Sequence, residues 1–225
     1  MRILAVTHGP EVGPELFGDV VREEGQELVE WDIRGAGAPP RDVDAVMVFG
    51  GDQNVGEEDR HPWLHDEYDA LRHWVDTRTP LLCVCLGAQT LAHSLGGVVE
   101  PVGRTLAGFY PSTLTPEGAA DPVLGVLPRR FAALNANGYR FSLPGGAIEL
   151  ATGPVPQAFR VNGSAWAVQF HPEVRREQFV KWLRDDPSLE RSVEEVEAEL
   201  DEGLETWQEQ GRDLCRAFLR AAGAY

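Results

Sequence analysis

A strand, a tight turn and a helix follow one another within residues 80–97, and no other segment restricts the possible folds of the chain as strongly. Residues 81–85 are continuously apolar, which predicts a buried strand, and residues 88–95 have the composition of a helix that a pair of glycines ends. The turn places Cys85 beside the first N–H groups of the helix. Those unpaired donors and the helix dipole favour a thiolate, so we expect Cys85 to be a nucleophile.

A histidine and a glutamate follow a second predicted strand. This strand, at residues 164–170, ends just before His171, and Glu173 comes two positions later. Because positions i and i+2 point the same way in an extended chain, the Glu173 carboxylate can reach the imidazole, fix its tautomer and stabilise its protonated form. Alone, this segment would more simply be a strand end with a solvated carboxylate. Together with Cys85, it predicts a Cys-His-Glu catalytic triad.

Two glycines, Gly50 and Gly51, end another apolar run at residues 45–49. The run predicts a central parallel strand that is buried on both faces. Without side chains, the glycines let the backbone turn and present N–H groups to a ligand. Binding sites in open α/β sheets form at the carboxyl ends of the strands, where Cys85 also lies. We therefore expect the glycines to border the same site rather than to form a plain turn.

The rest of the pattern predicts an α/β fold, with an open, mostly parallel, doubly wound sheet of the flavodoxin type and helices on both faces. Residues 98–170 have short alternating segments with frequent glycine and proline, which predicts a small antiparallel extension of the sheet. The other elements that we expect are strands at residues 2–8 and 27–33 and helices at residues 14–24 and 62–77.

The C-terminal part, residues 185–225, is amphipathic and acidic. Apolar side chains recur at three- and four-residue spacing over residues 189–207, which predicts one helix or two. The acidic face either docks a partner enzyme or is the solvated side of helices that pack on the core, and the second is the commoner case. We expect a main domain, residues 1–184, and a C-terminal helical extension, residues 185–225, packed on it.

The composition argues against several classes of function. A net charge of −16 argues against binding to nucleic acid. No apolar run approaches the ~20 residues of a membrane span, and the start does not resemble a signal peptide, so we expect a cytoplasmic protein. We expect Cys83 and Cys215 in the core, without disulfides. His8, at a strand end, either borders the site or is a satisfied core histidine, and we expect no metal and no other cofactor.

Three blocks of the sequence resemble the signatures of the class I glutamine amidotransferases, at residues 49–51, 85–89 and 169–173. Residues 50–64 and 143–151 are similar to the stand-alone, GMP-synthase-like branch of that family. The likeness runs over residues 3–183. It implies that the main domain, residues 1–184, is an amidotransferase domain.

The resemblance also implies a reaction. Cys85 attacks the side-chain amide of glutamine, His171 moves protons, and Glu173 orients His171. Ammonia leaves, and water then cleaves the thioester. Beyond the triad, the resemblance implies an oxyanion hole at the N–H groups of Gly51 and Leu86 and a substrate pocket at Gly50 and Gln89.

Two places depart from the family pattern. Asn137 and Tyr139 stand where members of the branch usually carry a histidine and an aspartate, and Leu106 stands where many carry a glutamate. The triad is intact, so the thiol chemistry should survive. The wall that faces the acceptor or the partner differs, and the product of the branch does not carry over to this chain.

We expect a glutaminase that supplies ammonia to a separate synthetase. The chain has no phosphate-binding loop of the Walker type, and Lys181 is its only lysine, so an ATP-using synthetase would be another chain. One alternative is a stand-alone hydrolase that cleaves the γ-glutamyl amide of a small metabolite. The other is a non-catalytic binding protein on the same fold, which the intact triad disfavours.

Overall fold

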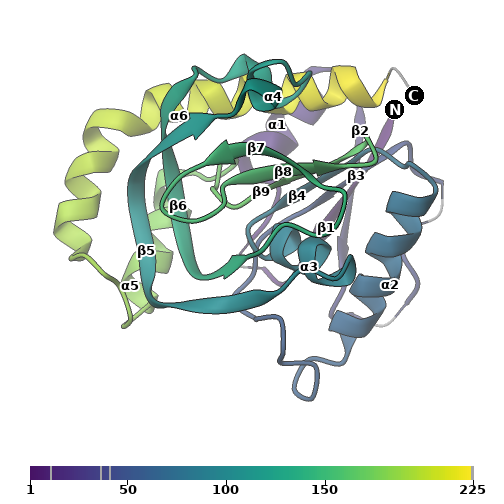
Figure 1. Cartoon of the computed structure of the whole chain (residues 1–225), viewed down its shortest axis with the longest axis horizontal. Coiled ribbons are helices and arrows are strands. Elements are labelled where there is room, and N and C mark those ends of the chain that lie inside the picture. Colours follow the sequence, from purple (N-terminus) through teal and green to yellow (C-terminus); the bar gives the residue numbers. More distant parts are fainter. Residues whose placement is uncertain (11, 36, 41, 224–225) are drawn as a thin grey trace.

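The chain forms one open sheet with helices on both faces (Figure 1). The computed structural model describes residues 1–10, 12–35, 37–40 and 42–223. In this part of the chain the strand order across the sheet is β2-β1-β3-β4-β9-β8-β7-β5-β6. The strands are β1 Arg2–Thr7, β2 Glu27–Asp32, β3 Ala45–Val48, β4 Leu81–Val84, β5 Val99–Leu114, β6 Arg130–Phe141, β7 Ile148–Thr152, β8 Ala158–Val161 and β9 Ala165–Val168.

The helices cover the two faces of the sheet and bury two separate apolar layers. Side chains of α1, α5 and α6 pack in one layer, and side chains of α2 and α3 pack in the other. Strands β1, β3 and β4 contribute alternate residues to each layer, which is why they are apolar throughout. The helices are α1 Glu15–Glu23, α2 Trp63–Asp76, α3 Leu86–Ser94, α4 Pro116–Ala119, α5 Arg176–Asp185 and α6 Val193–Ala222, with a 3₁₀ turn at Leu124–Val126.

The five strands from β2 to β9 pair in parallel, and their register sets the place of the site. Because these strands point the same way, the residues that follow them meet at one edge of the sheet. Four residues form one paired row: Val6, Val48, Cys83 and Ala167. Two positions beyond this row come His8, Gly50, Cys85 and Gln169. The predicted fold class is confirmed.

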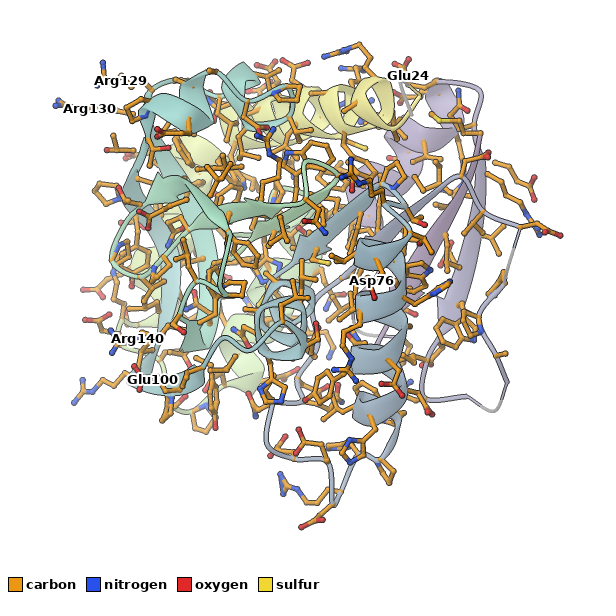
Figure 2. All side chains as sticks on the ribbon, turned by 45° about the vertical axis from the view of Figure 1, so that its right-hand side comes forward. Glu24, Asp76, Glu100, Arg129, Arg130 and Arg140 are labelled. Atoms are coloured by element: carbon orange, nitrogen blue, oxygen red, sulfur yellow. The ribbon has the colours of Figure 1, made fainter. Side chains whose placement is uncertain are left out.

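The antiparallel part differs from the expectation of short strands. β5 has 16 residues and β6 has 12, and they pair along most of their length. Pro101 and Gly103 fall at a register shift between Pro101 and Leu106, which marks a bulge inside one long strand, whereas Gly108 and Pro111 pair in regular register. Figure 2 shows Glu100 and Arg140 at one end of this pair of strands, where Arg140 donates to Glu100 at 2.6 Å.

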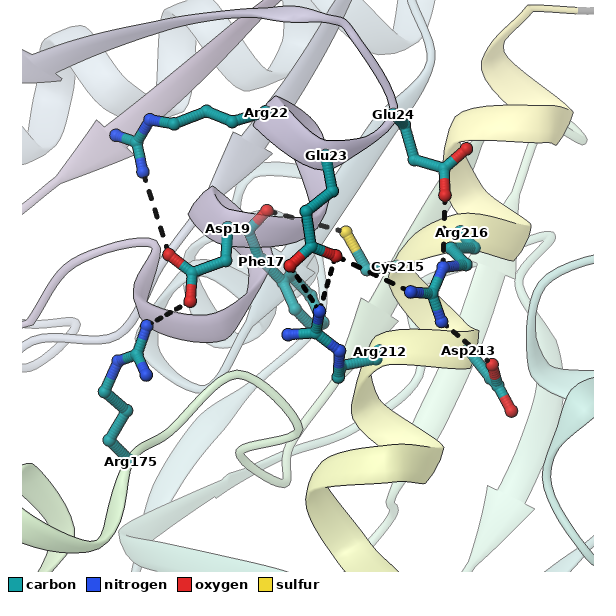
Figure 3. Close-up of polar contacts among 10 residues, drawn as sticks. All are labelled: Phe17, Asp19, Arg22, Glu23, Glu24, Arg175, Arg212, Asp213, Cys215 and Arg216. Atoms are coloured by element: carbon teal, nitrogen blue, oxygen red, sulfur yellow. Dashed lines mark hydrogen bonds and ion pairs between the residues drawn. The ribbon is translucent and has the colours of Figure 1, made fainter.

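The C-terminal part contains a single long helix, α6, which packs beside α1 on one face of the sheet (Figure 1). Figure 3 shows how the two helices join: Arg212 pairs with Glu23 at 2.6 Å, and Arg216 pairs with Glu24 at 3.1 Å. Cys215 is buried between them, as expected for a core cysteine. Apolar side chains of α6 belong to the same core as the sheet. The division at residue 184 stays a prediction.

None of the helices in the described ranges combines the length and the apolar character that crossing a bilayer requires.

Candidate active site

Cys85 is a one-residue turn between β4 and α3. Its backbone has a positive φ of 52° with ψ −107°, a conformation that is uncommon for a residue with a side chain. Strain of this kind concentrates at functional sites, where the surrounding structure holds it in place. The predicted boundaries were wrong here: the strand ends at Val84, and the helix begins at Leu86 rather than at residue 88. The turn is therefore tighter than the composition suggested.

Two hydrogen bonds between neighbouring elements hold this turn. The Cys85 N–H donates to the Val168 carbonyl of β9 at 2.9 Å, and the Gly87 N–H donates to the Phe49 carbonyl beyond β3 at 3.2 Å. The Cys85 turn is thus held from both sides, by β9 and by the residue that follows β3. The thiol that it presents is bordered by the ends of β3 and β9.

His171 and Glu173 form a buried pair beside this thiol. The His171 Nδ1–H donates to Glu173 Oε1 at 2.8 Å, and the two side chains are 3% and 0% exposed. Within the described part of the chain, the other carboxylate oxygen of Glu173 has no hydrogen-bond partner. Because Glu173 occupies Nδ1, the Nε2 atom is left for the interaction of His171 with Cys85. The structure thus brings the three predicted residues together.

The charge state of His171 depends on its two neighbours. Burial alone would lower the pKa of His171, but the Glu173 carboxylate and then Cys85 outweigh it and raise the pKa to about 10. The imidazolium form is therefore favoured near neutral pH. A proton is in place on the side chain that faces the thiol.

Backbone contacts from three elements hold the His-Pro-Glu segment. The His171 N–H donates to Leu134 in β6 at 2.8 Å, and the Leu16 N–H of α1 donates to the Glu173 carbonyl at 3.0 Å. From α6, the Trp207 indole N–H donates to the His171 carbonyl at 2.8 Å. The base and its orienting carboxylate are thus held by elements that lie far apart in the sequence.

A buried amide side chain, that of Gln169, also contacts the Cys85 thiol. Its Nε2 lies 3.6 Å from Cys85 Sγ, and its Oε1 accepts from Gln89 Nε2 at 3.3 Å. Gln89 also donates to the Tyr139 carbonyl at 3.3 Å. No role was predicted for Gln169 from the sequence. Its signal was its position two residues before His171, at the edge of the sheet where Cys85 also lies.

A cavity of about 630 Å³ opens at this edge of the sheet, and Cys85, His171 and Gly51 line it. Gln89, predicted in the substrate pocket, is not part of this lining among the described residues, and its pocket role stays a prediction. Charged side chains of both signs also line the cavity. They are Arg34, Asp52, Arg104, Lys181, Asp185 and Asp186.

The wall that departs from the family pattern is made by β6. Tyr139 lines the cavity together with Ala136 and Gly138. Asn137 is 3% exposed, accepts a hydrogen bond from Asn135 at 3.1 Å and donates to the Tyr139 carbonyl at 3.0 Å. Leu106 pairs with Asn137 across the two strands. Of the substituted residues, Tyr139 is therefore the one that changes the surface of the cavity.

The two predicted oxyanion-hole residues lie close to each other: a Cβ atom on Gly51 would lie 2.8 Å from Leu86 Cδ2. Gly51 lines the cavity, and Leu86 is the first residue of α3, where an N–H has no partner within the helix. A Cβ atom on Gly50 would lie 3.2 Å from His171 Cε1 and 3.6 Å from Cys85 Cβ. The glycine turn therefore packs directly against His171 and Cys85. The structure places the residues as expected, and their role stays a prediction.

Cys83 and Cys215 have different surroundings from Cys85. Burial raises the pKa of the Cys83 thiol well above its ordinary value, and the charge of Glu67 adds to this. Burial also raises the pKa of Cys215. Neither sulfur lines the cavity in the described part of the chain. Cys85 is the thiol that a substrate in the cavity can reach.

Comparison with known proteins identifies relatives of the chain. The family model described as glutamine amidotransferase class-I matches residues 21–186. A GMP synthase [glutamine-hydrolyzing] of Thermosipho africanus is 29% identical over 182 residues, which is 78% of this chain and 32% of the relative. The same enzyme of Thermomicrobium roseum is 34% identical over 151 residues, which is 66% of this chain and 27% of the relative. The chain thus spans about a third or less of the length of these curated relatives.

Solved structures share the whole fold. A glutamine amidotransferase from Thermotoga maritima superposes with a TM-score of 0.79 at 24% identity, covering 99% of this chain and 98% of that one. A glutamine amido transferase from Methylobacillus flagellatus superposes with a TM-score of 0.81 at 19% identity, covering 98% of this chain and 94% of that one. At these identities the likeness is one of fold.

Proposed function

Because the chain belongs to the class I glutamine amidotransferase family, we propose that it hydrolyses the side-chain amide of glutamine through a thioester on Cys85 and supplies the ammonia to a separate synthetase. The observation that carries the proposal is the buried His171–Glu173 pair, 2.8 Å apart, beside the strained turn at Cys85. A nucleophile, a base and an orienting carboxylate within reach of one another are what acyl transfer needs.

In the proposed reaction the Cys85 thiolate attacks the amide carbon. The oxyanion that forms accepts hydrogen bonds from the N–H groups of Gly51 and Leu86. The His171 imidazolium gives its proton to the leaving nitrogen, ammonia departs, and a thioester remains. Neutral His171 then takes a proton from water, which attacks the thioester carbon. Collapse releases glutamate and restores the thiolate and the imidazolium.

The lining of the cavity supports an amino-acid substrate. The α-ammonium and α-carboxylate groups of glutamine need partners of opposite sign within a few ångströms of each other. The lining offers Asp52 and Asp185 as well as Arg34, Arg104 and Lys181. We therefore assign the γ-amide to the Cys85 end of the cavity and the charged groups to its rim.

The comparisons support a partner for the ammonia. The curated relatives are named glutamine-hydrolysing GMP synthases, and this chain covers 32% of one and 27% of another. In this proposal, the part of those relatives that this chain does not match corresponds to the synthetase that receives the ammonia. We leave the acceptor open, since Tyr139 changes the cavity wall relative to the branch.

A stand-alone γ-glutamyl hydrolase is the second candidate, and the size of the cavity favours it. A volume of about 630 Å³ lies in the range of sites that bind drug-sized ligands, which are larger than an amino acid. A substituent on the amide nitrogen would occupy the additional space. In that case no partner would be needed.

The test compares substrates on the purified chain. Ammonia and glutamate are measured with glutamine alone, with glutamine plus a synthetase encoded beside this chain, and with N-substituted γ-glutamyl amides. Activation by the synthetase supports the first candidate, whereas rapid cleavage of a substituted amide without any partner supports the second. Cys85→Ser is the control for contaminating activity. No hydrolysis in any arm, together with no labelling of Cys85 by a glutamine-like diazo-ketone, would overturn both.

A further inference from the structure

A second buried histidine–glutamate pair lies next to the candidate triad. His8 follows β1, Glu67 belongs to α2, and His8 Nε2 lies 2.8 Å from Glu67 Oε2. The two side chains are 0% and 1% exposed. The other carboxylate oxygen accepts a hydrogen bond from Thr90 Oγ1 of α3 at 2.7 Å. The proposed reaction makes no use of this pair, although two buried ionisable groups are costly unless they are well paired.

The other nitrogen of His8 reaches the glycine turn. His8 Nδ1 lies 2.8 Å from the Gly50 carbonyl oxygen. A carbonyl oxygen can only accept, so Nδ1 carries the proton and donates it. Glu67 supports this arrangement from the far side of the ring. The Glu67 carboxylate is an acceptor for the Nε2–H of His8. Burial alone would lower the pKa of His8, but the charge of Glu67 outweighs it and raises that pKa.

Fixing the Gly50 carbonyl also fixes the Gly51 N–H. The described residues contain no cis peptide bonds, and in a trans peptide the carbonyl and the following N–H point in opposite directions. With its carbonyl on His8, the peptide directs the Gly51 N–H away from His8. Among the described residues, no protein acceptor receives this N–H, and Gly51 borders the cavity that Cys85 lines.

We propose that His8 and Glu67 are positioning residues that lock the Gly50–Gly51 peptide with its N–H toward the cavity, where it stabilises the oxyanion. This inference rests on the proposed amide hydrolysis and adds a cause for its oxyanion hole. Glycine peptides rotate easily, and rotation of this one would replace a donor by a carbonyl oxygen. The His8 hydrogen bond opposes that rotation before any substrate binds. Trp63, whose ring centroid lies 5.3 Å from that of His8, packs against the imidazole.

The test separates oxyanion stabilisation from the integrity of the site. His8→Leu removes the donor, whereas His8→Asn keeps an N–H near the position of Nδ1. Glu67→Leu removes the support, whereas Glu67→Gln can still donate to Nε2 and leave the proton on Nδ1. Each variant is assayed for kcat and KM with the γ-glutamyl amide that the wild type cleaves best. Alkylation of Cys85 by iodoacetamide, a displacement that forms no oxyanion, is measured in parallel.

We expect the two leucine variants to lose roughly 10²–10³-fold in kcat with KM changed by less than about threefold, since an oxyanion donor acts in the transition state. The asparagine and glutamine variants should recover most of that loss. Iodoacetamide should alkylate Cys85 at the wild-type rate in all four. Asp121→Asn, which weakens the pair between buried Asp121 and Arg160 of β8, is the control for lost stability without lost kcat.

Three results would overturn the inference. One is an unchanged kcat in His8→Leu and Glu67→Leu. Another is an equal loss of hydrolysis and of alkylation, which would mean that the site as a whole collapsed. The third is a failure of His8→Asn and Glu67→Gln to recover activity although their unfolding temperatures equal that of the wild type. A wild type that cleaves no γ-glutamyl amide would instead refute the proposed function, so the two failures are distinguishable.

Discussion

The Trp207 indole N–H donates to the His171 carbonyl at 2.8 Å, so a side chain of the C-terminal helix holds the backbone of the candidate base. Trp207 is also stacked on Phe131 of β6, with ring centroids 6.2 Å apart and planes 6° from parallel. The position of His171 therefore depends on a residue 36 positions later in the chain.

Replacing Trp207 by phenylalanine tests this contact. The smaller ring keeps part of the stacking on Phe131, but the buried His171 carbonyl loses its donor. We expect the free energy of unfolding to fall by about 1–3 kcal/mol, the cost of an unpaired buried polar group. We also expect a lower kcat, because His171 is less well placed. Urea denaturation and steady-state kinetics measure the two effects. Trp74→Phe, on the opposite face of the sheet, should leave kcat unchanged.

A glutamine-like diazo-ketone should modify Cys85 alone. Cys85 lines the cavity beside His171, whereas burial raises the pKa of Cys83 and of Cys215 and keeps both sulfurs protonated. Mass spectrometry of the digested protein should find the added mass on the peptide that contains Cys85. Adduct on Cys83 or Cys215 would contradict the assignment of the nucleophile.

The pH dependence of hydrolysis should report the His171–Glu173 pair. The pKa of His171 is raised to about 10, and the proton that protonates the leaving nitrogen is lost as the pH rises through that value. We therefore expect kcat/KM to fall on the alkaline side near pH 10. Glu173→Gln removes the largest interaction that raises this pKa, so the alkaline limb should move to lower pH. An alkaline limb that stays in place in this variant would show that another group controls it.

The same shift has a consequence for stability. His171 has a folded-state pKa above its ordinary value of 6.5, so its contribution to stability is fully present below about pH 6.5 and is lost as the pH rises toward 10. The difference in the free energy of unfolding between wild type and His171→Gln should therefore shrink from pH 6.5 to 10. Denaturation at several pH values measures it. A constant difference would refute the raised pKa.

Gly211 of α6 lies against the carbonyl of Pro172, in the His-Pro-Glu segment. A Cβ atom at this position would lie 1.9 Å from that oxygen, so Gly211→Ala must push the helix and the segment apart. We expect a loss of roughly 1–3 kcal/mol in stability, typical of overpacking, and a lower kcat. Gly203→Ala, in the same helix, would meet the Phe109 side chain at 3.0 Å and should be close to neutral.

The sequence was sufficient to predict the parallel half of the sheet and the meeting of Cys85, His171 and Glu173 at its edge. Apolar runs of strand length each end in a reactive or flexible residue, and parallel strands bring such ends together. Cys85, His171 and Gly50 were found in this way. The positive φ of Cys85 could not be predicted, because the turn is held by hydrogen bonds to Val168 of β9 and to Phe49, which are distant in the sequence.

The contribution of Glu67 was also beyond the sequence. Nothing local relates position 67 to position 8, since their contact exists only once α2 has packed on the sheet. The long strands β5 and β6 were missed for another reason. Proline and glycine usually end strands, but a bulge near Pro101 accommodates them here.

The helix pair of Figure 3 also sets the order in which the site can be completed during synthesis. The thiol turn and the glycine turn lie in the first half of the chain, but the thiol turn is complete only when Val168 of β9 accepts from the Cys85 N–H. The His171–Glu173 segment is held in place only after α6 has packed. This helix brings the Trp207 indole to the His171 carbonyl and joins α1 through Arg212 and Glu23. A nascent chain that stops short of α6 therefore carries the nucleophile with an unanchored base. If the chain hydrolyses glutamine as proposed, we expect hydrolysis to begin only after α6 has docked, so that unfinished chains release no ammonia.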